Sequence, residues 1–237
     1  MPDGAARPGL LLYCQHVPGM GHLVRSLALA RALTDRFRVV FLNGGAMPRG
    51  IGRPGGVEFV DLTPIALDAD GDLASLDRRR SLERVLTARC RTILETFQRV
   101  GPAVVLAELF PFGRKKFAPE LIPLFDVAHD LGRSRPLLVT SVRDILVTGR
   151  ENQVRHDDRA GALANRYLDA VRVHADPCFV RFEESFRPRQ PLQVPVHYTG
   201  FVTAPARAAA EAAAPPPGGA RRIVVSAGGG RVGGPLL

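Results

Sequence analysis

Short apolar segments alternate with helical segments along residues 1–202, and this alternation limits the possible folds more than any other feature of the chain. The first apolar segment, Gly9–Cys14, is soon followed by a helical pattern over residues 22–33, with leucines and alanines on one face. A short, wholly apolar run is typical of a strand covered on both sides. Repeated strand–helix pairs predict an α/β fold, a Rossmann-like, doubly wound and mainly parallel sheet with helices on both faces.

The same reasoning divides the rest of the chain. Further helices are predicted at residues 72–100, 114–132 and 159–171. Residues 203–220 are rich in Ala, Pro and Gly and predict a linker. Residues 221–237 then begin a new apolar strand and a glycine-rich loop. Further strands are predicted at residues 37–45, 56–62, 103–110, 136–142, 171–177 and 196–202.

Composition narrows the functional class. The chain has 237 residues, is 46% hydrophobic and carries a formal net charge of +9. That length is enough to bury a full core. No nucleic-acid-binding motif accompanies the charge, so no nucleic-acid partner is predicted, although a peripheral contact with an anionic membrane stays open. The three cysteines are far apart, which predicts buried free thiols. No signal peptide or membrane span is visible, which predicts a cytoplasmic protein.

The loop between the first strand and the first helix is the clearest candidate site. It contains Gly19, Gly21 and His22, and in doubly wound folds ligands bind beyond this edge of the sheet. A Walker A loop is excluded because no Lys-Ser/Thr pair follows the second glycine. A dinucleotide fingerprint is disfavoured because Val24 replaces its third glycine and Asn43 its acidic residue. His22 could act as a base or oxyanion donor, or could merely pack the turn.

Two further strands end in charged residues that belong to the same edge. Glu108 could bind an acceptor hydroxyl or serve as the base, but it could equally form a salt bridge with Arg114 or Lys115. Arg143 could contact a phosphate or an anionic acceptor, although pairing with Asp144 is the simpler interpretation.

Other histidines also fall at this edge. His16 lies inside the first loop and is the chief rival of His22 as the base. His174 and Asp176 close another strand, and for them stabilisation of a turn is expected rather than catalysis. No metal-ligand spacing is present, so neither a metal site nor a cofactor is predicted.

Several motifs together resemble one known family. The run GMGHLVRSLALARAL at residues 19–33 resembles the first loop and helix of GT-B glycosyltransferases related to the MurG-type family 28. Stretches at residues 108–117, 141–147, 173–177 and 198–202 resemble a bacterial branch of predicted glycosyltransferases. Residues 223–237 resemble the opening of the second Rossmann-like domain of that fold. The order and spacing of these motifs are more specific than any one of them.

The resemblance implies the N-terminal, acceptor-side half of a GT-B fold, followed by the start of a donor-side domain. It implies transfer of a sugar, of the hexosyl type, from a nucleotide-sugar to a small-molecule or lipid-linked acceptor, without a cofactor. Gly19 and Gly21 would shape the loop beside the donor diphosphate, with His22 as the candidate base or electrostatic helper. Most donor-binding residues would lie beyond Leu237, so this chain alone is expected to be inactive. The implied donor-side loop consists of Gly228, Gly229 and Gly230.

Two other functions stay open at this point. Nucleotide-sugar hydrolases and epimerases use the same architecture with similar Gly-x-Gly-His loops. A non-catalytic subunit of a split glycosyltransferase is also possible, because the strand at residues 223–226 could pair with a second chain that supplies the missing domain.

Overall fold

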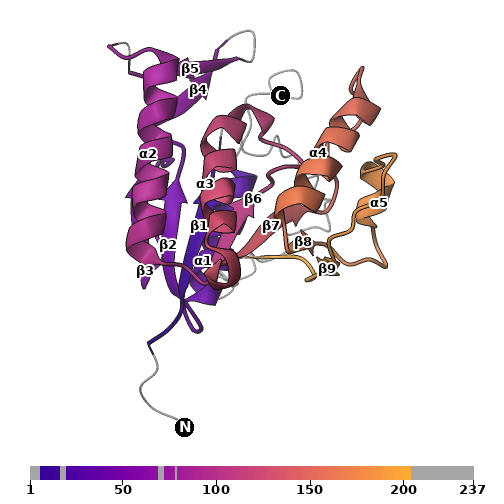
Figure 1. The fold of residues 1–237 in the computed structure, drawn as a ribbon, viewed down its shortest axis with the longest axis horizontal. Helices are drawn as coiled ribbons and strands as arrows, with labels where there is room; N and C mark the ends of the chain where they lie inside the picture. Colours follow the sequence, from indigo (N-terminus) through magenta and orange to yellow (C-terminus); the bar gives the residue numbers. More distant parts are fainter. Residues whose placement is uncertain (1–5, 17–19, 69–71, 78, 204–237) are drawn as a thin grey trace, which may run out of the picture.

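A seven-stranded, wholly parallel sheet forms the centre of the molecule (Figure 1). The computed structural model describes residues 6–16, 20–68, 72–77 and 79–203. The strand order β3-β2-β1-β6-β7-β8-β9 confirms the predicted doubly wound α/β class. The strands are β1 (Gly9–Cys14), β2 (Arg38–Asn43), β3 (Val57–Asp61), β6 (Val104–Glu108), β7 (Leu137–Arg143), β8 (Ala170–His174) and β9 (Val196–Tyr198).

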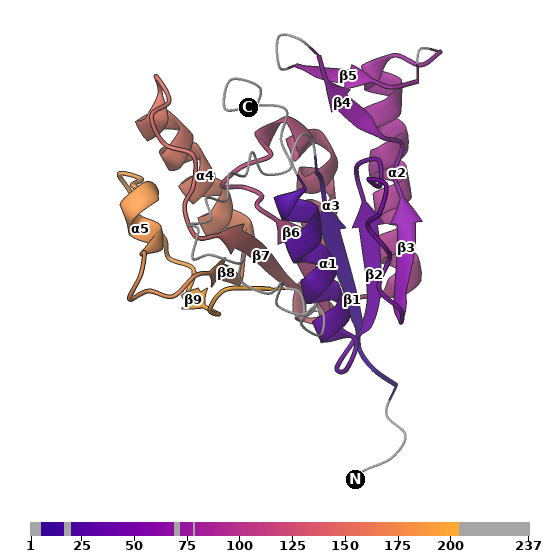
Figure 2. The same ribbon diagram turned by 180° about the vertical axis from the view of Figure 1, so that it is seen from behind.

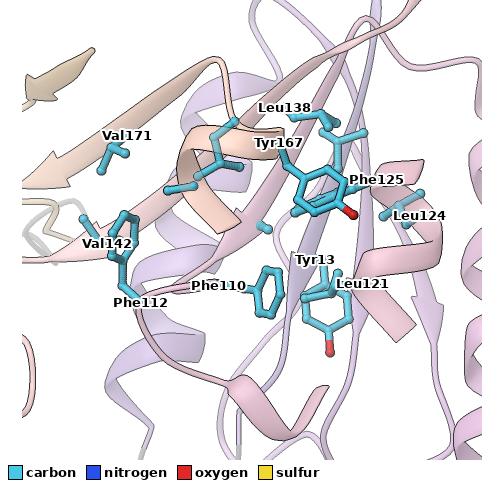
Figure 3. Close-up of a cluster of buried hydrophobic side chains, with 14 of the residues drawn as sticks. Tyr13, Phe110, Phe112, Leu121, Leu124, Phe125, Leu138, Val142, Tyr167 and Val171 are labelled. Carbon is cyan, nitrogen blue, oxygen red and sulfur yellow. The ribbon is translucent and has the colours of Figure 1, made fainter. Parts of the chain in front are cut away.

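Helices cover both faces of this sheet, because alternate strand residues point to opposite sides. Leu10 and Leu12 of β1 pack with α1 (Gly21–Leu33), which lies in front of the sheet in Figure 2. Leu11 and Tyr13 belong to the larger cluster on the other face, part of which Figure 3 shows. That face is covered by α2 (Leu82–Val100), α3 (Ala118–Asp130) and α4 (Gln153–Tyr167), and the short α5 (Phe182–Ser185) adds Phe182 to the cluster.

The predicted helix at residues 72–100 is wrong at its beginning. Residues 65–67 and 73–75 instead form an antiparallel hairpin, β4 (Ile65–Leu67) and β5 (Leu73–Ser75). The hairpin lies at the beginning of α2, at the top of Figure 1. The helix starts only at Leu82, because Ser81 is extended and its hydroxyl accepts a hydrogen bond from the amide of Arg84. Burial of Ile65 against Val85 anchors the hairpin to the helix.

Smaller differences concern the next helices. The predicted helix at 114–132 is split into a 3-10 turn, Lys115–Phe117, and α3, which begins where Pro119 fits the first turn. The predicted helix at 159–171 starts six residues earlier, since α4 begins at Gln153 and already ends at Tyr167.

The sheet reverses its direction of growth between β1 and β6. Strands β2 and β3 extend it on one side of β1, and β6 to β9 extend it on the other. Because all seven strands are parallel, their carboxyl ends meet at one edge. The loops after β1 and β6 therefore diverge at a topological switch point, where doubly wound folds leave a crevice for ligands.

Some predictions concern parts of the chain that the structure covers only partly. The predicted linker at 203–220, apart from Thr203, and the predicted second-domain start at 221–237 lie outside the described residues. All three cysteines are free, but the prediction that they are buried holds only for Cys14, because Cys90 is partly buried and Cys178 is exposed. Among the described residues, no helix combines the length and the apolar character that a bilayer crossing requires.

Candidate functional site

His22 and Glu108 meet at the switch point of the sheet. Glu108 is the last residue of β6, and His22 is the second residue of α1, directly after the loop that leaves β1. Nδ1 of His22 lies 2.5 Å from Oε1 of Glu108. A carboxylate at Nδ1 favours the tautomer in which Nδ1 carries the proton and Nε2 keeps its lone pair. The pair thus has the geometry of a general base and its orienting carboxylate.

Two arginines also face this carboxylate. Nη2 of Arg25 donates to Oε1 of Glu108 at 2.8 Å, and Nε of Arg114 lies 3.9 Å from Oε2. The Glu108 side chain is only 1% exposed, so these cations offset the cost of burying its charge. Oε2 of Glu108 and Nε and Nη2 of Arg114 are buried and make no hydrogen bond to the rest of the described chain. The cluster around Glu108 therefore contains buried polar atoms that have no hydrogen-bond partner among the described residues.

The backbone that follows Glu108 is strained. Leu109 and Arg114 have φ angles of 63° and 56°, values that residues with side chains rarely adopt. A Cβ atom added to Gly113 would lie 2.6 Å from a methyl group of Leu109, so the turn has no room for a larger residue. Strained turns of this kind cluster at functional sites, and this one sets the position of Arg114.

His16, the predicted rival of His22, is engaged elsewhere. Its Nε2 is 3.0 Å from Oδ1 of Asn43, and the side chain is 8% exposed. Burial lowers the pKa of His16, and the hydrogen bond to Asn43 only partly opposes that effect. Asn43 occupies the position where a dinucleotide-binding fold carries its acidic residue, and here it donates to Asp61 and to the carbonyl of Gly45. His16 thus braces the loops after β1 and β2.

A cleft of about 240 Å³ opens at the beginning of α1, and its described lining includes Gly21, the residue before His22, but neither His22 nor Glu108. Gly21, Arg25 and Arg143 contribute to its wall, together with the exposed ring of Phe201. Arg143 lies with its Nε 3.3 Å from Oδ1 of Asp144, so the expected internal pairing is present. The structure therefore brings Gly21 and Arg143 to one cleft.

His174 also lines this cleft but is held by two hydroxyl groups. Its Nε2 is 2.7 Å from Oγ of Ser141 and its Nδ1 is 2.7 Å from Oγ1 of Thr199. Burial, reinforced by the nearby Arg25 charge, lowers the pKa of His174 to about 4. Asp176 accepts hydrogen bonds from the amides of the turn that follows. The contacts of Asp176 agree with the expected stabilisation of a turn, whereas His174 links β7 to the segment after β9.

A second buried charge cluster was missed by the sequence analysis. Arg89 of α2 is fully buried, and Nε and Nη2 on one edge of its guanidinium group donate to the two carboxylate oxygens of Glu120 at 2.7 Å. It also donates to Oε1 of Gln15 and to the carbonyl groups of Gly44 and Thr63. The hydroxyl group of Tyr13 donates to the same carboxylate. Arg89 thus fixes the loops that leave β1, β2 and β3. Its position on the apolar face of α2 was the signal that could have revealed it.

The remaining predicted site residues have simpler outcomes. Gly21 begins α1, and an added Cβ would meet no atom within 4 Å, so no close approach explains it. Gly19 and the loop of Gly228, Gly229 and Gly230 lie outside the described residues. Within the described ranges, no three His, Cys, Asp or Glu side chains gather as a metal-binding group would.

Comparison with known proteins gives a structural likeness only. No family model and no curated protein matches the sequence. Similar solved structures include Phytolacca americana UGT2 complexed with UDP-2fluoro-glucose and pterostilbene (15% identity, TM-score 0.49), which covers 84% of this chain. TcCGT1 in complex with UDP is 15% identical over 83% of this chain (TM-score 0.48), and the calicheamicin glycosyltransferase CalG4 is 16% identical over 82% (TM-score 0.44).

The chain spans about half the length of these proteins, namely 55%, 51% and 53% of them. At such TM-scores the fold class of this chain rests on its own strand order and connections.

Proposed function

We propose that this chain is the acceptor-side domain of a GT-B glycosyltransferase that uses a nucleotide-sugar donor. The observation that carries the proposal is the His22–Glu108 pair at the switch point of a doubly wound sheet. The ordered set of motifs that resemble the MurG-type family 28 supports it, and so does the cleft at the beginning of α1, which Arg25 and Arg143 line. The activity belongs to a protein that also contains the donor-side domain.

In this proposal His22 is the general base. Nε2 accepts the proton of an acceptor hydroxyl group as the oxygen forms its bond to the anomeric carbon of the donor sugar. The bond from that carbon to the phosphate oxygen breaks, and the electron pair leaves with the nucleoside diphosphate. Glu108 acts through His22, because a carboxylate that is 1% exposed cannot reach an acceptor directly. It holds the ring orientation and stabilises the imidazolium.

Basic groups would supply the charge that the leaving group needs. Arg25 and Arg143 line the cleft next to His22, where a diphosphate would depart. Gly19 and Gly21 would shape the loop at this position. The loop of Gly228, Gly229 and Gly230 would approach the diphosphate from the donor side through its amide groups.

The test uses the complete gene product, including its donor-side domain, with a panel of nucleotide-sugars and a mixture of hydroxyl acceptors. Release of nucleoside diphosphate should depend on an acceptor. The variant His22→Ala should lower turnover by roughly 10²- to 10⁴-fold, the usual contribution of a general base. His197→Ala is the matched control, since His197 is an exposed residue of the edge strand β9.

A wild-type rate for His22→Ala, with both variants folded, would refute the assignment of the base. Free sugar released without any acceptor would identify a hydrolase instead of a transferase. Activity that requires a second polypeptide would support the split-enzyme alternative.

A further inference from the structure

A second, strongly basic cleft lies between the beginnings of α3 and α4. Its volume is about 280 Å³, and its polar wall is formed by Lys115, Arg155 and Arg159, with Asn152 and His156 beside them. Its floor is apolar and includes Phe110 and Ala160, which are almost fully buried. None of the described residues that line the cleft carries a carboxylate.

Within the described ranges of the chain, these three cations have no counter-ion. No hydrogen bond or ion pair joins the Lys115, Arg155 or Arg159 side chain to any other described residue. In contrast, Arg53, Arg89, Arg135 and Arg189 each form an ion pair with an Asp or Glu side chain. The neighbouring acids are already engaged. Asp158 pairs with Arg189, and Asp157 accepts from Gln153 and from the amide of Arg187.

The helix that carries two of these arginines adds to the positive potential. The first turn of α4 contains no acidic residue, and its N-cap, Asn152, makes no side-chain capping hydrogen bond. A helix N-terminus carries a partial positive charge, which usually draws an acidic residue. Here it coincides with three unpaired cations over one cavity, so every charged feature of the cleft favours an anion.

We propose that this cleft binds a phosphate or diphosphate group carried by the acceptor substrate. Two guanidinium groups from α4 and one ammonium group from the turn before α3 suit the several oxygen atoms of a phosphate better than a single carboxylate. The apolar floor accommodates the body to which the phosphate is attached. The acceptor role rests on the proposed transferase function, but binding of the anion does not.

The cleft is placed for such a role. Phe110 and Pro111 of its floor follow Glu108 by two and three residues, in the turn that leaves β6. An adjoining cavity of about 210 Å³ shares Lys115 and His156 with this cleft and includes Arg114, the neighbour of Glu108. A phosphorylated acceptor held here could direct a hydroxyl group toward His22.

The experiment is isothermal titration calorimetry of the full 237-residue chain with inorganic diphosphate and with geranyl diphosphate. Arg155→Gln/Arg159→Gln should weaken binding about tenfold or more, the equivalent of losing one charge-assisted hydrogen bond. The matched control is Arg31→Gln/Arg91→Gln, which removes two exposed helical arginines away from the cleft and should bind like the wild type. Circular dichroism verifies that both double variants are folded.

Tighter binding of geranyl diphosphate than of inorganic diphosphate would identify a lipid-linked phosphate, and equal binding a phosphorylated polar acceptor. No binding of either probe, or equal binding by the two double variants, would overturn the proposal. Because this readout needs no turnover, its failure is distinct from failure of the transferase assay. Site-dependent binding without sugar transfer would leave the anion site standing and remove its role as an acceptor site.

Discussion

The buried Arg89 guanidinium makes the sharpest stability prediction, because all five of its N–H groups have an acceptor. Nε and Nη2 reach the two oxygens of Glu120 at 2.7 Å, Nη2 also reaches Gln15, and Nη1 donates to two backbone carbonyls. Arg89→Met keeps an unbranched apolar stem but leaves the Glu120 carboxylate buried without its cation. Loss of one partner of such a pair costs about 3–5 kcal/mol of unfolding free energy.

The measurement is urea unfolding followed by far-UV circular dichroism at pH 7. Arg84→Met is the control, since Arg84 is exposed on the same helix and its side chain has no ion pair with the described residues. The control should stay within about 0.5 kcal/mol of the wild type. A loss below about 1 kcal/mol for Arg89→Met would refute the reasoning.

A double variant separates the ion pair from the packing. In Arg89→Met/Glu120→Met no unpaired charge is left, so its loss should be smaller than the sum of the two single losses by more than about 1 kcal/mol. It should still be less stable than the wild type, because the carbonyls of Gly44 and Thr63 lose their donor. Strict additivity would mean that the charges do not interact as the distances indicate.

Three further predictions follow from other buried groups. Gly44→Ala should cost about 1–3 kcal/mol, because the added Cβ would lie 2.1 Å from Oε1 of Gln15, whereas Gly52→Ala meets no atom and should be neutral in the same unfolding assay. The pKa of His174 falls from 6.5 to about 4 on folding, so the unfolded chain binds the extra proton between those values. The contribution of His174 to the free energy of unfolding should therefore be fully present above pH 6.5 and fall by up to roughly 3 kcal/mol toward pH 4. Urea titrations at several pH values should find this dependence reduced in His174→Asn but not in His197→Asn. Iodoacetamide at pH 8 should modify the exposed Cys178 first and leave Cys14 intact until the protein unfolds, because burial raises the pKa of the Cys14 thiol to about 12. Peptide mass spectrometry of the labelled protein measures this order. Equal labelling of both thiols, a pH profile unchanged in His174→Asn, or full stability of Gly44→Ala would each contradict its prediction.

The strand–helix order was predictable because a parallel sheet buries its strands on both faces. Runs such as Gly9–Cys14 have no polar position that could face water, and the helices between them follow the 3.6-residue period. The hairpin before α2 was not predictable in this way. Its strands have three residues each, too short for a period-two pattern, and what holds them is the distant contact of Ile65 with Val85.

The site was partly predictable for the same reason. His22 and Glu108 could be placed at one edge from the chain order alone, since both follow parallel strands. Their pairing could not be derived, because Glu108 had sequence neighbours, Arg114 and Lys115, that offered a local salt bridge. The observed partners include Arg25, which lies one helical turn after His22 and so reaches the same carboxylate.

Both buried acids at this edge of the sheet serve as points where separate loops converge. The Glu120 carboxylate accepts hydrogen bonds from Arg89 and Tyr13. Through Arg89 it holds the loops after β1, β2 and β3. The Glu108 carboxylate is hydrogen-bonded to His22 and Arg25 of α1, and it lies near Arg114 in the turn that follows β6. The first cluster is fully closed, with every donor of Arg89 used, whereas the second keeps unpaired atoms beside a cleft. A closed cluster fixes geometry, and an open one can exchange protons and bind a ligand. That difference in hydrogen bonding is why chemistry is assigned to Glu108 and His22, and support to Glu120 and Arg89.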